Sequence, residues 1–442
     1  MKAEDRASTT GLTLTTSLTS RQLVLIGLLM ILVALAVFTR FYRLGTPGDF
    51  YFDEVYFPTT AQEILHGDPA AWEWFGHENT HPPLSKLFMA GGMALFGENA
   101  FAWRFFGALA GVGSVAFIYL LGRRLFNSEI VGIAAGFLIV FEGLFFVQSR
   151  MATPDTYLVF FILGSIYFLV SDRPLLSGIF FGAAMATKWT AALTVFPIGL
   201  YFVYRFLQTD RSQWRKFLTE ASIAVPLFFL VVPFSIYLLT YAPMFFSGHT
   251  LRDAWDLNHF AFDFHRDREL THPYSSPWRE WPIMMRPVFL YVSAGGAKIY
   301  SLGNPIIFWL GLPALGFALW QGLAGVRAKL DEATGRLSVS GAVGAEQTAL
   351  LFVVLTYLGF FLPWAIQPRI MFIYHYLPSL PFLLLALAYV IHRLWHQPWG
   401  RGGAFLFLAA AALTFVYFYP HLAAVEVSDS LAESYFWFDS WR

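Results

Sequence analysis

Long apolar segments alternate with short polar connections along most of this chain. Eleven of these segments approach the roughly 20 residues that a helix needs to cross a bilayer. The predicted helices cover 22–41, 101–122, 129–147, 155–171, 174–187, 189–206, 217–240, 303–324, 346–365, 371–394 and 403–420. The segment 83–97 is apolar but short, and it contains Gly91-Gly92, so it is either a twelfth span or a helix on the membrane surface. The pattern predicts an all-α integral membrane protein with about 11 transmembrane helices.

The basic connections decide between these two readings of 83–97. Short cytoplasmic loops are enriched in Lys and Arg. If 83–97 does not cross, the basic loops share the side of the N-terminus; they contain Arg123, Arg124, Arg173, Arg211, Arg215, Lys216, Arg327, Lys329, Arg393 and Arg401. If it does cross, most of them lie outside. We therefore expect the N-terminus inside and 83–97 on the membrane.

This orientation predicts four regions. They are a cytoplasmic N-terminal tail (1–21), an N-terminal membrane module (22–240) whose first outer loop is 42–100, an outer loop (241–302), and a C-terminal membrane module (303–442). The second outer loop mixes Trp255, Phe260, Phe262, Phe264, Trp278 and Trp281 with charges. That mixture is typical of interfacial amphipathic helices.

Composition agrees with a membrane location and narrows the chemistry. The chain is 57% hydrophobic and only 13% charged, well below the charged share of soluble domains. The formal net charge is zero, which argues against a nucleic-acid partner. Cysteine is absent, which excludes disulfides, thiolate metal sites and a cysteine nucleophile. The first apolar run lacks a cleavage pattern, so we read it as an uncleaved helix.

Polar residues near the membrane gather on the predicted outer side, and such residues are usually functional. Asp53-Glu54 follows the first span. One reading is a general base that takes a proton from an acceptor hydroxyl; the other is a solvated acid pair on a loop, and the residues alone leave both open. Glu142, on the outer half of the third span, reads as a buried structural acid paired with a cation.

Cations on the same side suggest a phosphate and sugar site. Lys86, in His81-Pro-Pro-Leu-Ser-Lys86, either meets a lipid phosphate or extends to the headgroups. Arg369 has the planar fork that suits phosphate, and Tyr374 and His375 follow it. The remaining candidates, which are otherwise interfacial anchors, are Arg104, Arg150, Asp155 and Lys188. No metal or other cofactor is expected, because HExxH and EF-hand motifs are absent and the cations suffice to neutralise a leaving phosphate.

Taken together, these motifs resemble the protein O-mannosyltransferase family, whose members have the GT-C membrane glycosyltransferase fold. The resemblance runs from about residue 24 to 420. Its motifs are Phe52-Asp-Glu-Val, His81-Pro-Pro-Leu-Ser-Lys86, Arg104, Ser149-Arg150 to Asp155, Thr187-Lys188-Trp189, His272-Pro-Tyr-Ser-Ser-Pro-Trp278 to Trp281-Pro282, and Arg369 to Pro378. Each is weak alone, but seven in this order are specific.

The resemblance implies roles for these residues. Asp53 would be the catalytic base, Glu54 would help to bind acceptor or sugar, and Lys86, Arg104 and Arg369 would bind the lipid phosphate. Tyr56 and Tyr374 stand where the family often has His. The segment 241–302 is too short for the large lumenal domain of eukaryotic members, which points to a bacterial type.

The function expected from this resemblance is inverting transfer of mannose. The donor would be a polyprenyl-phosphate sugar, and the acceptors would be Ser or Thr of proteins on the outer face of the plasma membrane. The other expected partners are membrane lipids and secretion machinery. An alternative keeps the donor class but uses a lipid or cell-wall glycan acceptor, as aminoarabinose transferases do. A secondary transporter would instead show internal repeats, and an oligosaccharyltransferase would show WWDYG; the chain has neither.

Overall fold

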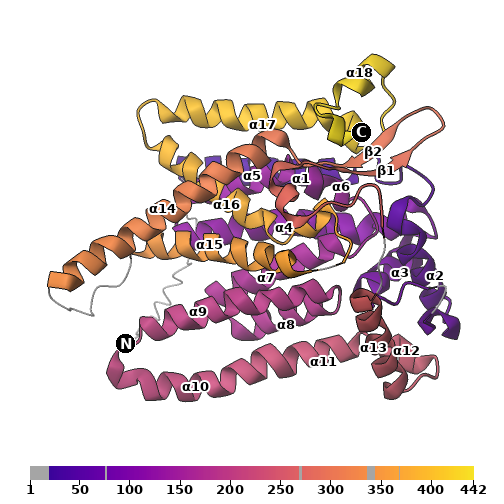
Figure 1. Cartoon of the computed structure of the whole chain (residues 1–442), viewed down its shortest axis with the longest axis horizontal. Coiled ribbons are helices and arrows are strands. Elements are labelled where there is room, and N and C mark those ends of the chain that lie inside the picture. Colours follow the sequence, from indigo (N-terminus) through magenta and orange to yellow (C-terminus); the bar gives the residue numbers. More distant parts are fainter. Residues whose placement is uncertain (1–18, 75–76, 268–270, 336–343, 368) are drawn as a thin grey trace, which may run out of the picture.

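The computed structural model describes residues 19–74, 77–267, 271–335, 344–367 and 369–442. Most of the chain forms helices that lie side by side in a bundle (Figure 1). Residues 1–18 of the predicted tail, and the side chains of Arg327 and Lys329, lie outside the described part.

Each of the eleven predicted ranges contains a helix. Seven helices, some counted with their adjoining turns, are long and apolar enough to cross a membrane: α1 (Ser20–Phe41), α4 (Ala100–Phe126), η3 with α9 (Trp189–Leu207), η4 to α11 (Arg211–Leu239), the first part of α14 (Pro305–Gly335), α15 with η7 (Ala345–Ile366), and α17 (Gly400–Leu422). Shorter apolar helices are α3 (Leu84–Phe96), α5 (Glu129–Val140), α7 (Asp155–Val170), α8 (Pro174–Met185) and α16 (Leu380–Trp395). The chain is therefore a multi-pass membrane protein.

Several predicted ranges differ in detail from the observed helices. The range 129–147 is broken, because α5 ends at Val140 and α6 (Gly143–Gln148) begins after Glu142. The carboxylate of Glu142 accepts hydrogen bonds from the amides of Leu144 and Phe145 and of Asn304. Glu142 is thus a buried structural acid as predicted, but its hydrogen-bond partners are backbone amides and not a cation.

The range 371–394 starts later than predicted. The short turn η8 (Ile373–Tyr376) comes first, and α16 begins only at Leu380. Pro378 and Pro381 account for the delay, because neither has an N–H to donate to a carbonyl four residues earlier, so a regular helix does not run through this stretch. The late start leaves Tyr374 and His375 on an irregular segment.

One end of the bundle carries the irregular elements. There lie α2 (Phe57–Leu65), α3, α12 (Ala242–Phe246), α13 (Leu251–Asp267) and α18 (Asp429–Ser434), beside an antiparallel hairpin of β1 (Val288–Val292) and β2 (Lys298–Ser301) (Figure 1). The hairpin was not predicted. The turn between α9 and α10 (Trp214–Pro226), and the far ends of α14 and α15, lie at the opposite end.

Candidate active site

The acid pair sits on the short 3-10 turn η1 (Phe52–Val55). Adjacent side chains on such a turn diverge by about 120°, because it has about three residues per turn. Glu54 is fully buried, whereas Asp53 lines a cavity of about 180 Å³. Phe52 has a left-handed backbone (φ 50°), and its ring packs edge-on against Phe372 and Tyr374. The fold therefore holds the turn in a strained conformation and separates the two acids.

Glu54 is bound entirely within the protein. Nε and NH2 of Arg104 donate to its two carboxylate oxygens at 2.7 and 2.6 Å, and the amide of Ala152 donates at 2.8 Å. The rest of the Arg104 guanidinium donates to the carbonyls of Leu44 and Pro47. Arg104 and Glu54 thus fix the loop that carries η1. Both side chains thus pair with each other inside the fold, whereas Glu54 was expected to bind acceptor or sugar and Arg104 the lipid phosphate.

Arg150 has a similar anchoring role. It is 5% exposed, and it donates to the carbonyls of Thr39, Arg40, Tyr42 and Arg43 at the C-terminal end of α1. The last carbonyls of a helix lack partners within the helix. Arg150 therefore ties this end to the turn before α7, and it lines neither of the two cavities described below.

Two adjoining cavities form the centre of the site. The one beside Asp53 holds about 180 Å³, and its neighbour, lined also by Trp189, Trp364 and Gln367, holds about 400 Å³. Six residues line both cavities: Thr80, His81, Lys188, His265, Arg369 and His375. The shared wall thus brings two of the predicted phosphate ligands, Lys188 and Arg369, close to the predicted base.

Lys188 and Asp155 form an ion pair at this wall. The ammonium of Lys188 donates to Asp155 at 2.8 Å and lies 5.8 Å from the centre of the Tyr374 ring. Within the described residues, Arg369 has no carboxylate partner; its guanidinium donates to Nδ1 of His265 at 2.6 Å. Among the residues that the structure describes, the charge of Arg369 at the cavity wall is therefore not paired directly with a carboxylate.

The surroundings of Asp53 suit a proton acceptor. Burial raises the pKa of Asp53 to about 7, with the carboxylates of Asp155 and Glu78 adding to the rise while Lys188 opposes it. Among the described residues, no group donates a hydrogen bond to its side chain. A carboxyl that is half ionised near neutral pH and faces a cavity can serve as a general base.

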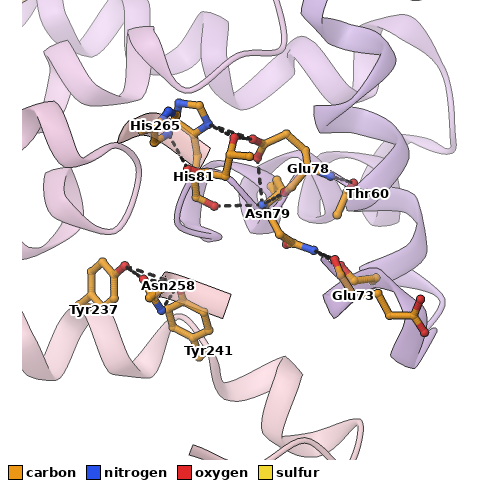
Figure 2. A network of polar contacts seen from close by, with 12 residues as sticks. Thr60, Glu73, Glu78, Asn79, His81, Tyr237, Tyr241, Asn258 and His265 are labelled. Carbon is orange, nitrogen blue, oxygen red and sulfur yellow. Dashed lines mark hydrogen bonds and ion pairs between the residues drawn. The ribbon is translucent and has the colours of Figure 1, made fainter. Parts of the chain in front are cut away.

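Lys86 does not line either cavity. It is fully buried, and its ammonium donates to the carboxylate of Glu78 at 3.1 Å, to the backbone carbonyl of Glu78, and to the carbonyl of His81 at 3.1 Å. Figure 2 shows Glu78 at the centre of this network, between Thr60 and His81. Lys86 and Arg104 are thus paired with Glu78 and Glu54 inside the fold, and of the three cations expected at the lipid phosphate only Arg369 lines the cavities.

His81, Tyr374 and His375 do reach the site. The Nδ1 atom of His81 lies 2.9 Å from Glu78, and Tyr374 lines the cavity beside Asp53. His375 stacks on Trp281, with ring centres 6.0 Å apart, and lines both cavities.

Glu78 and His265 were missed by the sequence analysis. Glu78 stands three residues before His81, so its proximity to the motif was a usable signal. His265 lies among the aromatic and charged residues of α13, where no pattern marks it. Among the described residues, no group of three or more His, Asp or Glu side chains is arranged to hold a metal ion.

Two family models match this chain, each over a different part of it. Residues 80–237 match the family described as dolichyl-phosphate-mannose-protein mannosyltransferase. Residues 250–441 match the C-terminal four-transmembrane region of protein-O-mannosyltransferase. A polyprenol-phosphate-mannose–protein mannosyltransferase of Mycolicibacterium smegmatis is 30% identical, over 93% of this chain and 92% of the relative. One from Mycobacterium tuberculosis is 27% identical, over 93% and 91%.

Solved structures share the fold. The protein O-mannosyltransferase Pmt1-Pmt2 complex of Saccharomyces cerevisiae, bound to the sugar donor, gives a TM-score of 0.82 at 16% identity, covering 96% of this chain and 93% of that chain. ArnT from Cupriavidus metallidurans in the apo state gives 0.58 at 16% identity, covering 93% and 68%. The GT-C architecture is thus confirmed, and the relative at 30% identity shows that this chain belongs to the protein O-mannosyltransferase family of membrane glycosyltransferases.

Proposed function

We propose that this chain transfers mannose from a polyprenyl-phosphate carrier to Ser or Thr hydroxyls of proteins. The observation that carries the proposal is the single wall at which Asp53 meets Lys188 and Arg369. One cavity therefore contains a proton acceptor, Asp53, and two cations that can bind a phosphate, Lys188 and Arg369. The mycobacterial relatives are named for this reaction, and they match the chain along nearly its whole length.

The reaction begins with Asp53. Its carboxylate accepts the proton of the acceptor hydroxyl as the oxygen attacks the anomeric carbon of the sugar. A bond forms between that oxygen and the anomeric carbon, while the bond between the carbon and the phosphate oxygen breaks on the opposite face. The configuration at the carbon is therefore inverted, and polyprenyl phosphate leaves with the bonding electron pair.

Lys188 and Arg369 stabilise the leaving phosphate. Both line the wall shared by the two cavities, so both can approach an anion there. Charges already in place where negative charge develops are usually the largest single contribution to catalysis. The larger cavity, with Trp189, Leu193 and Trp364 in its wall, suits the apolar start of the polyprenyl chain.

We propose further that the active-site end of the bundle faces away from the cytoplasm, in the plasma membrane. Support comes from the basic residues at the opposite end: Arg123 and Arg124 close α4, and Arg205 closes α9. Short cytoplasmic connections carry such an excess of Lys and Arg. Acceptor proteins would then be modified as they emerge from the cell.

The test is to incubate the purified chain with polyprenyl phosphate carrying labelled mannose, and to offer a Ser/Thr-rich peptide and membrane lipids together. We expect label in the peptide, with the glycosidic configuration inverted. Label in lipid alone would support the alternative acceptor class, and no label in either would refute the proposal.

A further inference from the structure

His265 connects three segments that are distant in the sequence. It lies near the end of α13, and its ring packs edge-on against the ring of His81, with the ring centres 5.3 Å apart (Figure 2). Nε2 lies 2.9 Å from the carbonyl oxygen of Thr80, and Nδ1 lies 2.6 Å from NH1 of Arg369. The first loop, α13 and the segment before η8 therefore meet at one imidazole.

The chemistry of the two partners fixes the state of this ring. A guanidinium only donates hydrogen bonds, and a carbonyl oxygen only accepts them. Nδ1 must therefore be the unprotonated acceptor, and Nε2 must carry the proton. Burial, assisted by His81 and Arg369, lowers the pKa of His265 to about 3, so the ring stays neutral near pH 7. The imidazole thus acts as an acceptor for a cation.

Within the described residues, His265 is the side chain that holds the guanidinium of Arg369 by a hydrogen bond. Arg369 lies between the turns η7 (Leu362–Ile366) and η8, outside any helix. Among the described residues, no carboxylate forms an ion pair with it. An arginine restrained by an aspartate would lose much of its charge to that partner, whereas a neutral imidazole orients the guanidinium and leaves its charge for a ligand.

We propose that His265 is a positioning residue, which holds the guanidinium of Arg369 at the cavity wall and thereby sets the affinity for the phosphate of the lipid-linked donor. The inference rests on the proposed function, since it assigns Arg369 to that phosphate. His265 does not touch the reacting atoms. Its effect reaches the substrate through Arg369.

Two amide substitutions separate this role from simple packing. The amide oxygen of Asn occupies about the position of the imidazole Nδ1, whereas the amide nitrogen of Gln occupies about that of Nε2. His265→Asn therefore keeps the acceptor for Arg369, and His265→Gln keeps only the donor for Thr80. His265→Phe keeps the ring contact with His81 and loses both hydrogen bonds.

The experiment measures binding of polyprenyl phosphate, without a sugar, to the full-length chain in lipid nanodiscs. We expect His265→Gln and His265→Phe to weaken binding about tenfold or more, the effect of losing one hydrogen bond to a charged group. His265→Asn should stay within about threefold of the unmodified chain. In an Arg369→Gln background the three substitutions should have little further effect, because coupled residues are not additive.

Equal affinities for the Asn and Gln variants would overturn the positioning role, as would full additivity with Arg369→Gln. The unfolding midpoint of each variant shows whether it is folded, and the Asn and Gln variants differ too little in size for packing alone to separate them. The proposed function fails independently, when the unmodified chain binds polyprenyl phosphate but transfers no mannose to peptide.

Discussion

Arg104 binds both carboxylate oxygens of Glu54, at 2.7 and 2.6 Å, and neither side chain is exposed. Paired hydrogen bonds of this kind are the strongest that an arginine forms with a carboxylate. The ion pair joins α4 to the turn that carries Asp53. The position of the proposed base therefore depends on a contact that takes no part in the reaction.

Removing one partner of this pair should destabilise the chain. Glu54→Gln leaves the Arg104 guanidinium buried without its counter-charge, which costs about 3–5 kcal/mol. Arg104→Gln likewise leaves the carboxylate of Glu54 buried without a counter-charge. The double variant should lose less stability than the sum of the two single changes, because they break the same pair. Thermal unfolding in one detergent measures all four proteins, and simple additivity would contradict the coupling.

Asp53→Asn should abolish turnover without harming the fold. Loss of a general base lowers the rate by about 10²–10⁴-fold. Burial raises the pKa of Asp53, so the folded state disfavours the ionised form, and its ionisation removes stability as pH rises through about 7. The Asn variant escapes this loss and should unfold at a higher temperature than the unmodified chain at pH 8. Near-normal turnover would remove Asp53 from its role.

The activity of the unmodified chain should rise with pH through about 7, the pKa of Asp53. The base works only when ionised, so kcat/KM should fall about tenfold per pH unit on the acid side of this value. Asp155→Asn removes one negative charge and frees Lys188 to face Asp53. Both effects favour the ionised form of Asp53, so the acid side of the kcat/KM profile should move to lower pH. A profile whose acid side stays in place, or moves to higher pH, would contradict the coupling of Asp53 to Asp155 and Lys188.

Arg369 and Lys86 provide a matched pair of cations. Arg369→Gln should weaken binding of polyprenyl phosphate by about tenfold or more and leave the unfolding temperature nearly unchanged, since Arg369 lies at a cavity wall. Lys86→Gln should do the opposite, because Glu78 would then be buried without Lys86. Equal effects of the two changes on binding would show that both cations serve the donor.

The orientation can be checked because the chain has no native cysteine. Glu73 and Gln208 are exposed. Glu73 caps η2 (Pro69–Trp72), which follows α2, and Gln208 caps α9; α2 and the turn after α9 lie at opposite ends of the bundle (Figure 1). A membrane-impermeant thiol reagent added to intact cells should label Glu73→Cys and should reach Gln208→Cys only after the membrane is opened. The reverse pattern would invert the topology.

The sequence predicted the helices well, and it selected some of the residues that the structure brings together around the cavities. Apolar runs of about 20 residues have few folding alternatives in a membrane, so each predicted range contains a helix. Asp53, Lys188 and Arg369 were selected because their residue types suit the chemistry, and the structure places all three around one cavity. The sequence pattern could not reveal that Glu54, Lys86 and Arg104 form buried ion pairs. Such pairs depend on contacts between residues far apart in the chain, such as residues 54 and 104. His265 stayed hidden for the same reason.

The divergence of Asp53 and Glu54 on η1 makes the order of these two acids informative. Exchanging them, as Asp53→Glu with Glu54→Asp, leaves composition and net charge unchanged, and most similarity scores barely register it. Yet the shorter side chain at 54 would draw its carboxylate about one bond length away from Arg104, and the longer one at 53 would fill space in a cavity of about 180 Å³. A homologue with the exchanged order could therefore keep its resemblance to the family while losing both its loop anchor and its proton acceptor.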